Sequence, residues 1–406
     1  DYLGLTLADL EQDPHQRYAA SALGLMRFQR TQAVLSWEAE AGSELRVRTV
    51  AYHQALQRAW TKLNGFANGT DIHSLLQADP SGGTAALYLA ILRGEEDSQG
   101  AEQALLIGTN DRRFQSVGLQ SEARWTHTLG PVAGTLETGL RLHQDRVVRL
   151  HDEKGYDMLD GALVDRGEDL QVTTDSLSVA QALALHAHEE LDFGALILLP
   201  GGRVEVVRTF VDEEEADTRV VGLPGIAAML RPDPLLDIFA GLHRGFSPVS
   251  PGQAPEVRPE LAWTAETGLR LHREEALAEV VGFLVDYANL TGECTMSSGC
   301  DSDAIGQQFN GGRALVLGVE ALGQLRPAVG PFHLPLQASY AYTHSSFLSD
   351  FRSDFSQFGD VQAGDRLPYS PEHQLGGRLA LEHERFDLGA GASWRRFPRA
   401  PSSSRE

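Results

Sequence analysis

The two cysteines are the residues whose chemistry is easiest to predict. Cys294 and Cys300 are the only cysteines of the chain, and five residues separate them. Two thiolates could begin a zinc site, but the further clustered ligands that zinc needs are missing around them. In an oxidising compartment the same short spacing favours a disulfide. We therefore expect a Cys294–Cys300 disulfide, and we expect no metal site.

Motifs of common enzymes are missing. The sequence has no G-x-S-x-G, H-E-x-x-H, C-x-x-C or G-x-x-x-x-G-K segment, so the usual arrangements for nucleophilic, zinc or nucleotide chemistry are not indicated. His186 and His188 would share one face of a strand, but a pair of histidines is more often part of a polar wall than a metal site. We expect no catalytic residue, no resident cofactor and no enzyme activity.

The elements that carry these residues follow a two-residue period. In the segment 334–343, apolar side chains at even positions alternate with Gln337, Ser339 and Thr343, which is the pattern of a strand with two different faces. The heptapeptide ETGLRLH occurs twice, at Glu137–His143 and at Glu266–His272. Each copy puts Glu, Gly, Arg and His on one side and leucine on the other. Leucine towards lipid and charge towards a wet interior is the pattern of a membrane barrel.

Segments of this kind predict about fourteen antiparallel strands, which are separated alternately by short turns and by long connections. Short turns on one side and long loops on the other are typical of outer-membrane barrels. The long connections are expected at 61–103, 151–171, 249–258, 291–311 and 347–370, and one short helix is expected at Thr84–Arg93. The strands are expected at 23–40, 44–60, 104–128, 134–150, 172–190, 194–210, 217–231, 235–248, 259–272, 276–290, 312–324, 332–346, 371–384 and 386–397.

Charge and hydropathy narrow the class of protein. The formal net charge of -22 would repel nucleic acid, so we expect no nucleic-acid partner. No apolar run is long enough for a transmembrane helix, whereas a barrel strand needs only about 9 to 11 alternating residues. Residues 1–14 have neither a basic nor an apolar segment of the kind that an export signal contains.

Several stretches resemble one known family, the TonB-dependent receptors for ferric citrate and related iron chelates. The most specific are GFLVDYANLTGECTMSSGC at Gly282–Cys300, QQFNGG at Gln307–Gly312 and LGVEAL at Leu317–Leu322. The resemblance covers nearly the whole chain. The supporting stretches lie at Ile107–Gln120, Gly139–His151, Gly241–Gly252 and Pro259–Arg270.

The resemblance implies an all-β transmembrane barrel in the bacterial outer membrane. Such receptors have a barrel of 22 strands and an N-terminal plug domain that couples transport to TonB, ExbB and ExbD. We expect residues 1–397 to be a partial, monomeric barrel domain that lacks the plug and the last strands, and residues 398–406 to be a disordered or non-native tail. Outer-membrane lipid and lipopolysaccharide are the expected surroundings.

The resemblance also implies that the transported ligand is a ferric chelate. Ferric citrate is anionic, so its site should offer arginines together with amide donors on the inner wall or at the loop bases. The candidates are Arg112, Arg113, Arg149, Arg244, Gln307, Gln308 and Asn310.

Two other functions remain open at this point. A plug-less porin would share the strand pattern, because the wall of a passive pore obeys the same alternation. A barrel hydrolase would need a serine and a histidine that meet only in the folded chain, and such a meeting leaves no sequence motif.

Overall fold

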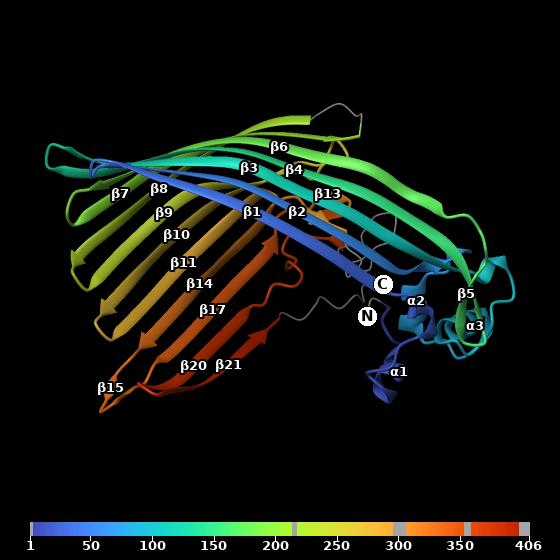
Figure 1. Cartoon of the computed structure of the whole chain (residues 1–406). Coiled ribbons are helices and arrows are strands. Elements are labelled where there is room, and N and C mark those ends of the chain that lie inside the picture. The colour runs from blue at the N-terminus through green and yellow to red at the C-terminus, as the bar shows by residue number, and fades with distance from the viewer. Residues whose placement is uncertain (1–2, 213–216, 295–305, 353–358, 398–406) are drawn as a thin grey trace.

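One antiparallel sheet dominates the chain. The computed structural model describes residues 3–212, 217–294, 306–352 and 359–397. Figure 1 shows the long strands side by side, with the short turns at one end of the sheet and the helices at the other. The long strands are β1 (Leu25–Ala41), β2 (Leu45–Phe66), β3 (Leu105–Leu129), β4 (Val132–Leu159), β6 (Gln171–Asp192), β7 (Leu196–Val211), β8 (Asp217–Asp233), β9 (Leu236–Ser247), β10 (Glu260–Arg273), β11 (Ala276–Asn289), β14 (Ala314–Leu325), β17 (Leu336–Phe347), β20 (His373–His383) and β21 (Phe386–Arg396).

Short strands extend or accompany this sheet. Three of them belong to it, so that it has 17 strands where the sequence predicted about fourteen; these are β5 (Ala162–Asp165), β15 (Ala328–Val329) and β16 (Phe332–His333). Four more form two separate small hairpins near the long-loop end, namely β12 (Thr291–Glu293) with β13 (Gln308–Asn310), and β18 (Phe351–Arg352) with β19 (Asp360–Val361).

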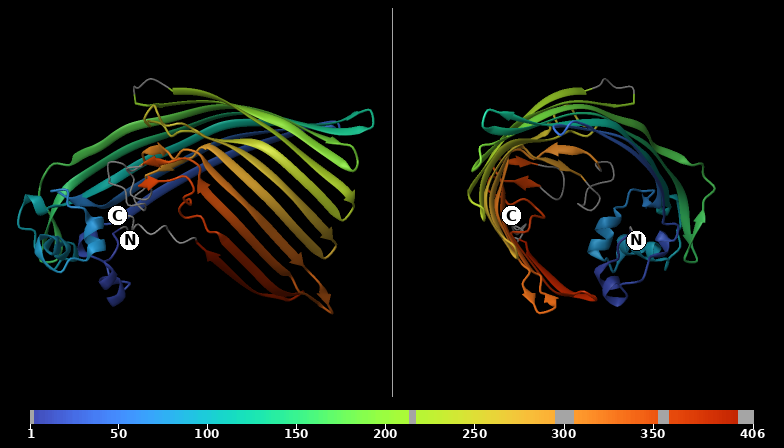
Figure 2. Two further views of the ribbon diagram at one scale, coloured as in Figure 1. Left: turned by 180° about the vertical axis from the view of Figure 1, so that it is seen from behind. Right: turned by 60° about the vertical axis from the view of Figure 1, so that its left-hand side comes forward.

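Each long strand pairs with its neighbours in sequence, from β1 through β21. Among the described residues β1 pairs only with β2 and β21 only with β20, so the sheet does not close on itself. Figure 2 shows the result, a sheet that curls through much of a barrel and has two open edges. Long antiparallel strands twist and curl in this way when they are built to form a barrel wall.

The two faces of the sheet differ as the alternation predicted. Leu142 and Leu271, from the two ETGLRLH copies, are each 47% exposed, as are many apolar side chains on their side of the sheet. We call this side the leucine face. Arg141 and His143 lie on the opposite side, where both contact Tyr52. We call this side the polar face.

Side chains on the polar face are crowded. The Tyr52 hydroxyl lies over Gly118, where an added Cβ would come within 2.2 Å of its oxygen, and the Phe283 ring covers Gly318. A Cβ at Gly318 would also lie 2.1 Å from the backbone oxygen of Tyr342. Crowding over glycine is expected on the concave side of a curled sheet. We therefore take the polar face as the inner wall.

Four of the five tryptophans lie on the leucine face near strand ends, where an interfacial girdle is expected. Trp37 and Trp125 are near short turns, whereas Trp263 and Trp394 are near the other end, and all four are exposed. Trp60 differs. It follows the parity of Tyr52 on β2 and so lies on the polar face, beneath the Lys62 ammonium.

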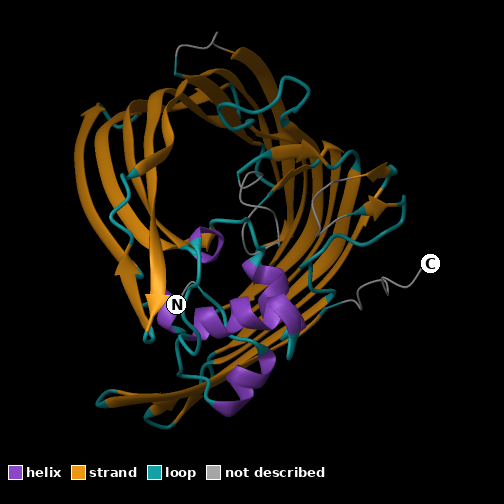
Figure 3. Ribbon diagram, turned by 90° about the vertical axis from the view of Figure 1, so that its right-hand side faces the viewer, coloured by secondary structure: helices purple, strands orange, loops and turns teal. Residues whose placement is uncertain are grey.

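Three helices lie at the long-loop end (Figure 3), and the second and third of them contribute buried side chains to a small apolar core. They are α1 (Leu7–Gln12), α2 (Ile72–Ala78) and α3 (Gly83–Arg93), with 3-10 turns at Ala19–Ser21 and Ala101–Gln103. Thr6 and Asp71 cap α1 and α2 by accepting backbone N–H groups. No helix among the described residues is long and apolar enough to cross a membrane.

Helix α3 confirms the helix predicted at Thr84–Arg93 and packs as a loop element. Its residues Leu89, Ile91 and Leu92 are fully buried against the ends of β2 and β3, where Phe66 and Leu105 lie. Two loop boundaries were wrong. The predicted loop 61–103 begins only after Phe66, and much of the predicted loop 151–171 is a hairpin of β4 and β5. In both places the antiparallel pairing of the strands continues past the predicted ends.

The predicted disulfide falls partly outside the described residues. Cys294 is fully buried at the end of β12, where its backbone N–H donates to Gln307. Cys300 is not among the described residues, so the pairing of the two cysteines stays a prediction. The same holds for the tail at 398–406.

Candidate functional site

Three arginines stand directly opposite one another on the polar face. Arg58 of β2 pairs in register with Arg112 of β3, and Arg112 pairs with Arg149 of β4. All three share the parity of Tyr52, Gly118 and His143, so they point to the inner wall. The residues that flank this row are Phe28 of β1 and Ser176 of β6, neither of which carries charge. The structure thus builds an uncompensated arginine row.

Two further basic groups lie next to the arginine row. The Nε of Arg112 donates to Nε2 of His151 over 3.2 Å, and a guanidinium can only donate, so this imidazole nitrogen is the acceptor. His151 is therefore neutral in this arrangement. Lys62 is four residues beyond Arg58 on the same face of β2 and is only 7% exposed.

The arginine row lacks internal neutralisation. Neither Arg58, Arg112 nor Arg149 forms an ion pair with an acid among the described residues, and the buried Nε atoms of Arg58 and Arg149 have no hydrogen-bond partner there. Like charges directly opposite across strands destabilise a sheet. An anion with several oxygens, placed over the row, would remove this repulsion and satisfy guanidinium donors.

Two predicted ligand residues do not face this wall. Arg113 follows Arg112 in a regular strand, so it must point to the leucine face, where its guanidinium is exposed and lies 3.7 Å from Asp111. Arg244 shares the parity of Leu242 and stands opposite Trp263, again on the leucine face. Neither residue therefore belongs to the inner wall, because neighbouring strand residues alternate between faces, and their part in ligand binding stays a prediction.

The predicted amides Gln307, Gln308 and Asn310 lie apart from the arginine row, at the base of another loop. Gln308 accepts from the backbone of Ser250, and its own N–H donates to Gln253. Gln307 accepts through its carbonyl from Cys294. These bonds tie the hairpin of β12 and β13 to the connection at 249–258.

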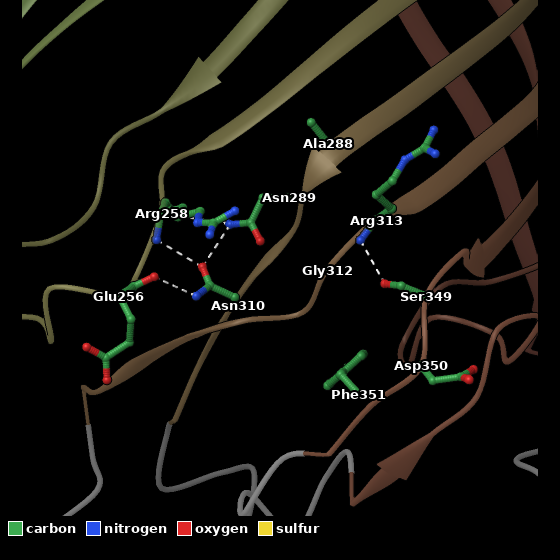
Figure 4. Close-up of a pocket in the computed structure, with 10 residues that line it drawn as sticks. All are labelled: Glu256, Arg258, Ala288, Asn289, Asn310, Gly312, Arg313, Ser349, Asp350 and Phe351. Atoms are coloured by element: carbon green, nitrogen blue, oxygen red, sulfur yellow. Dashed lines mark hydrogen bonds between the residues drawn. The ribbon is translucent and has the colours of Figure 1, made fainter.

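Asn310 lines a pocket of about 420 Å³ at this loop base. Its side chain accepts from the Arg258 backbone and from Asn289, and it donates to the carbonyl of Glu256 (Figure 4). These three hydrogen bonds all join the Asn310 side chain to residues at the base of the loops. The other residues that line the pocket are Ala288, Gly312, Arg313, Ser349, Asp350 and Phe351.

The sequence reasoning missed Arg58, Lys62 and His151. A local signal existed for the first two, because R-x-x-x-K at 58–62 places two cations on one face of a strand. The row itself depends on the register of β2 against β3 and of β3 against β4, and a single strand does not encode that register.

Comparison with known proteins agrees with this fold. The sequence matches the family described as "TonB dependent receptor-like, beta-barrel" over residues 3–405. The chain therefore belongs to the TonB-dependent receptor β-barrel family. Proteins of this family are outer-membrane proteins. No curated protein matches the sequence.

Solved receptors share the fold. The ferric citrate transporter FecA in its unliganded form is 17% identical with a TM-score of 0.67, and the match covers 97% of this chain and 52% of that one. The ferric-catecholate import receptor Fiu from E. coli K12 is 13% identical with a TM-score of 0.62, covering 94% and 55%. The siderophore receptor PiuA from Acinetobacter baumannii is 10% identical with a TM-score of 0.64, covering 92% and 55%. The chain thus spans about half the length of these receptors.

Proposed function

We propose that the chain forms part of the wall of a bacterial outer-membrane receptor that imports an anionic ferric chelate, with ferric citrate as the first candidate. Arg58, Arg112 and Arg149 are proposed to bind the chelate. The observation that carries this proposal is the arginine row, in which three guanidinium groups oppose one another on the inner wall without an acid between them.

The chemistry of the row suits a polycarboxylate. Each guanidinium presents a planar set of donors that matches a carboxylate, and charge-assisted bonds of this kind are about twice as strong as neutral ones. The chain has a net charge of -22, so the arginine row, which has no acid between its members, is a local region of opposite charge. Such a row would attract an anionic chelate along the inner wall.

Binding alone does not move a ligand across a membrane. We propose that uptake is coupled to TonB, which the family name includes. We further propose that a plug domain of the complete receptor makes this coupling and that ExbB and ExbD act with TonB. Because the chain spans about half the length of the solved receptors, transport is proposed for the complete gene product in the outer membrane. The family match favours this function over a plug-less porin or a barrel hydrolase.

The test is a titration of the complete receptor with ferric citrate, in which tryptophan fluorescence reports the binding. Arg112→Gln removes the central guanidinium of the row. Loss of its charge-assisted hydrogen bonds should weaken binding about tenfold or more. The matched control is Arg124→Gln, which changes the same residue type on the same strand and the same face, towards the short turn.

Equal affinity of the Arg112→Gln and Arg124→Gln proteins would contradict the proposed site. Absence of binding by the unaltered receptor would contradict ferric citrate as the ligand. Other ferric chelates, both anionic and neutral, are then titrated in the same way, and a preference for neutral chelates would contradict the role of the arginine row.

A further inference from the structure

His151 lies diagonally across from Arg112 on the inner wall. Arg112 of β3 pairs in register with Arg149 of β4, and His151 is two residues beyond Arg149, so it is on the same face of the sheet. Long side chains of diagonal neighbours can reach each other across an antiparallel strand pair. Within the described part of the chain, the bond from Nε of Arg112 to Nε2 of His151 is the only hydrogen bond of the Arg112 side chain.

This bond distinguishes the central arginine from the other two members of the row. The buried Nε atoms of Arg58 and Arg149 have no hydrogen-bond partner among the described residues. The neighbouring layer of side chains on the other side of the row is apolar and offers no acceptor; it consists of Leu56, Phe114 and Val147. His151 therefore determines how the guanidinium plane of Arg112 is oriented.

A neutral imidazole is suited to this task. It accepts the Nε–H bond through Nε2 and has its own hydrogen on Nδ1, whereas a protonated imidazole has no acceptor nitrogen and would lose the bond. A carboxylate at the same position could also accept from Arg112, but it would neutralise the guanidinium and repel an anion nearby. The imidazole orients the guanidinium and leaves its positive charge to a ligand.

We propose that His151 is a positioning residue of the chelate site, which holds Arg112 by its Nε and so leaves both terminal nitrogens to a carboxylate of the ligand. Two parallel bonds from a guanidinium to a carboxylate depend on the orientation of the guanidinium plane. His151 acts through Arg112 and does not itself contact the chelate. This inference rests on the proposed function, because it concerns the same arginine row.

The test is a titration of variants of the complete receptor with ferric citrate. His151→Leu removes the acceptor, His151→Gln keeps a neutral acceptor, and His151→Glu keeps an acceptor but adds a negative charge. The matched control is His143→Leu, which makes the same change on the same face of the same strand. His143 bonds to Tyr52 and Asp145 and has no contact with the row.

His151→Leu should weaken binding about tenfold, which is the usual effect of losing one hydrogen bond to a charged group. His151→Gln should restore the affinity to within about threefold of the unaltered receptor. His151→Glu should bind more weakly than His151→Gln, although both side chains can accept from Arg112. His143→Leu should bind ferric citrate like the unaltered receptor.

A double variant separates positioning from a general effect on the wall. Arg112→Gln combined with His151→Leu should bind no more weakly than Arg112→Gln alone, because His151 has no route to the ligand once the guanidinium is gone. A residue that only stabilised the barrel would give losses that add. Folding of each variant is checked by its heat-sensitive mobility in gels, and if His151→Leu does not fold, the comparison of His151→Gln with His151→Glu decides.

Four results would overturn the inference. They are full affinity of His151→Leu, equal weakness of His151→Gln and His151→Leu, equal affinity of His151→Gln and His151→Glu, and additive losses in the double variant. Failure of the proposed function has a different signature. Arg112→Gln would then bind with unchanged affinity, whereas a loss in Arg112→Gln without any loss in His151→Leu overturns the role of His151 alone.

Discussion

At the scale of single residues, the packing of side chains on the polar face depends on glycines. Gly118 and Gly318 leave room for Tyr52 and Phe283 on the neighbouring strands. Tyr52 then joins His143 over 2.7 Å and accepts from Arg141, while His143 also contacts Asp145 over 2.9 Å. These bonds fix the inner wall below the arginine row.

We expect Gly318→Ala to destabilise the sheet by about 1–3 kcal/mol, because the new Cβ would meet the Tyr342 backbone oxygen and the Phe283 ring. Gly323→Ala on the same strand is the control, since nothing lies within 4 Å of its added Cβ. The measurement is the urea midpoint of the folded receptor in detergent. Equal midpoints for the two variants would show that the close approach at Gly318 does not affect the stability of the receptor.

At the scale of elements, one carboxylate attaches helix α1 to the helical core. Asp9 of α1 accepts from Tyr18 and from Arg93 of α3, whose Nε and terminal nitrogen lie 2.9 and 2.8 Å away. Thr6 also donates to it over 3.0 Å. A long-range bond between α1 and the end of α3 therefore fixes the N-terminal segment onto the core.

These contacts predict a pH dependence. Burial raises the pKa of Asp9, but hydrogen bonds from Tyr18, Arg93 and Thr6 outweigh it and hold the pKa below the ordinary 3.8. A lowered pKa in the folded state means that the stabilisation is complete above the ordinary pKa and is lost as pH falls through the folded value. We expect amide hydrogen exchange of α1 and α3 to accelerate beyond its intrinsic pH dependence below about pH 4.

Asp9→Asn should remove this acid-dependent step, and exchange in α1 and α3 should then be fast at neutral pH as well. The control is Glu11→Gln, which alters an exposed acid of the same helix. A step that persists in Asp9→Asn would assign the pH dependence to another group.

At the scale of the whole molecule, the sheet separates lipid-facing from water-facing side chains along every long strand. The separation explains how a chain with low mean hydropathy can form a membrane wall, since only alternate residues need to be apolar. It also explains how the neighbouring residues Arg112 and Arg113 of β3 lie in two different environments, one on each face.

The separation can be tested with adjacent residues of β3. Leu119 is 43% exposed on the leucine face, and Gln120 lies on the polar face. Leu119→Arg should destabilise the receptor folded in phosphatidylcholine vesicles by about 2–4 kcal/mol, as arginine does near the middle of a bilayer. Gln120→Arg should change this stability little. Folding is followed by the heat-sensitive mobility of the barrel in gels, and equal losses for both variants would contradict the assignment of faces.

The sequence by itself determined the class of fold. Two-residue alternation is a local property, so the strand segments, both ETGLRLH copies and the direction of their leucines were predictable. The helix at α3 was predictable for the same reason, from its own apolar spacing. The alternation could also have shown that Arg112 and Arg113 face opposite ways.

Only the tertiary structure decided which side chains meet. Arg58, Arg112 and Arg149 lie on three different strands, and their alignment depends on the register of two strand pairs. Hydrogen bonds between strands set that register, and each strand alone is compatible with several registers. For the same reason the sequence could suggest single arginines, but it could not show that Arg58, Arg112 and Arg149 meet in one row on the inner wall.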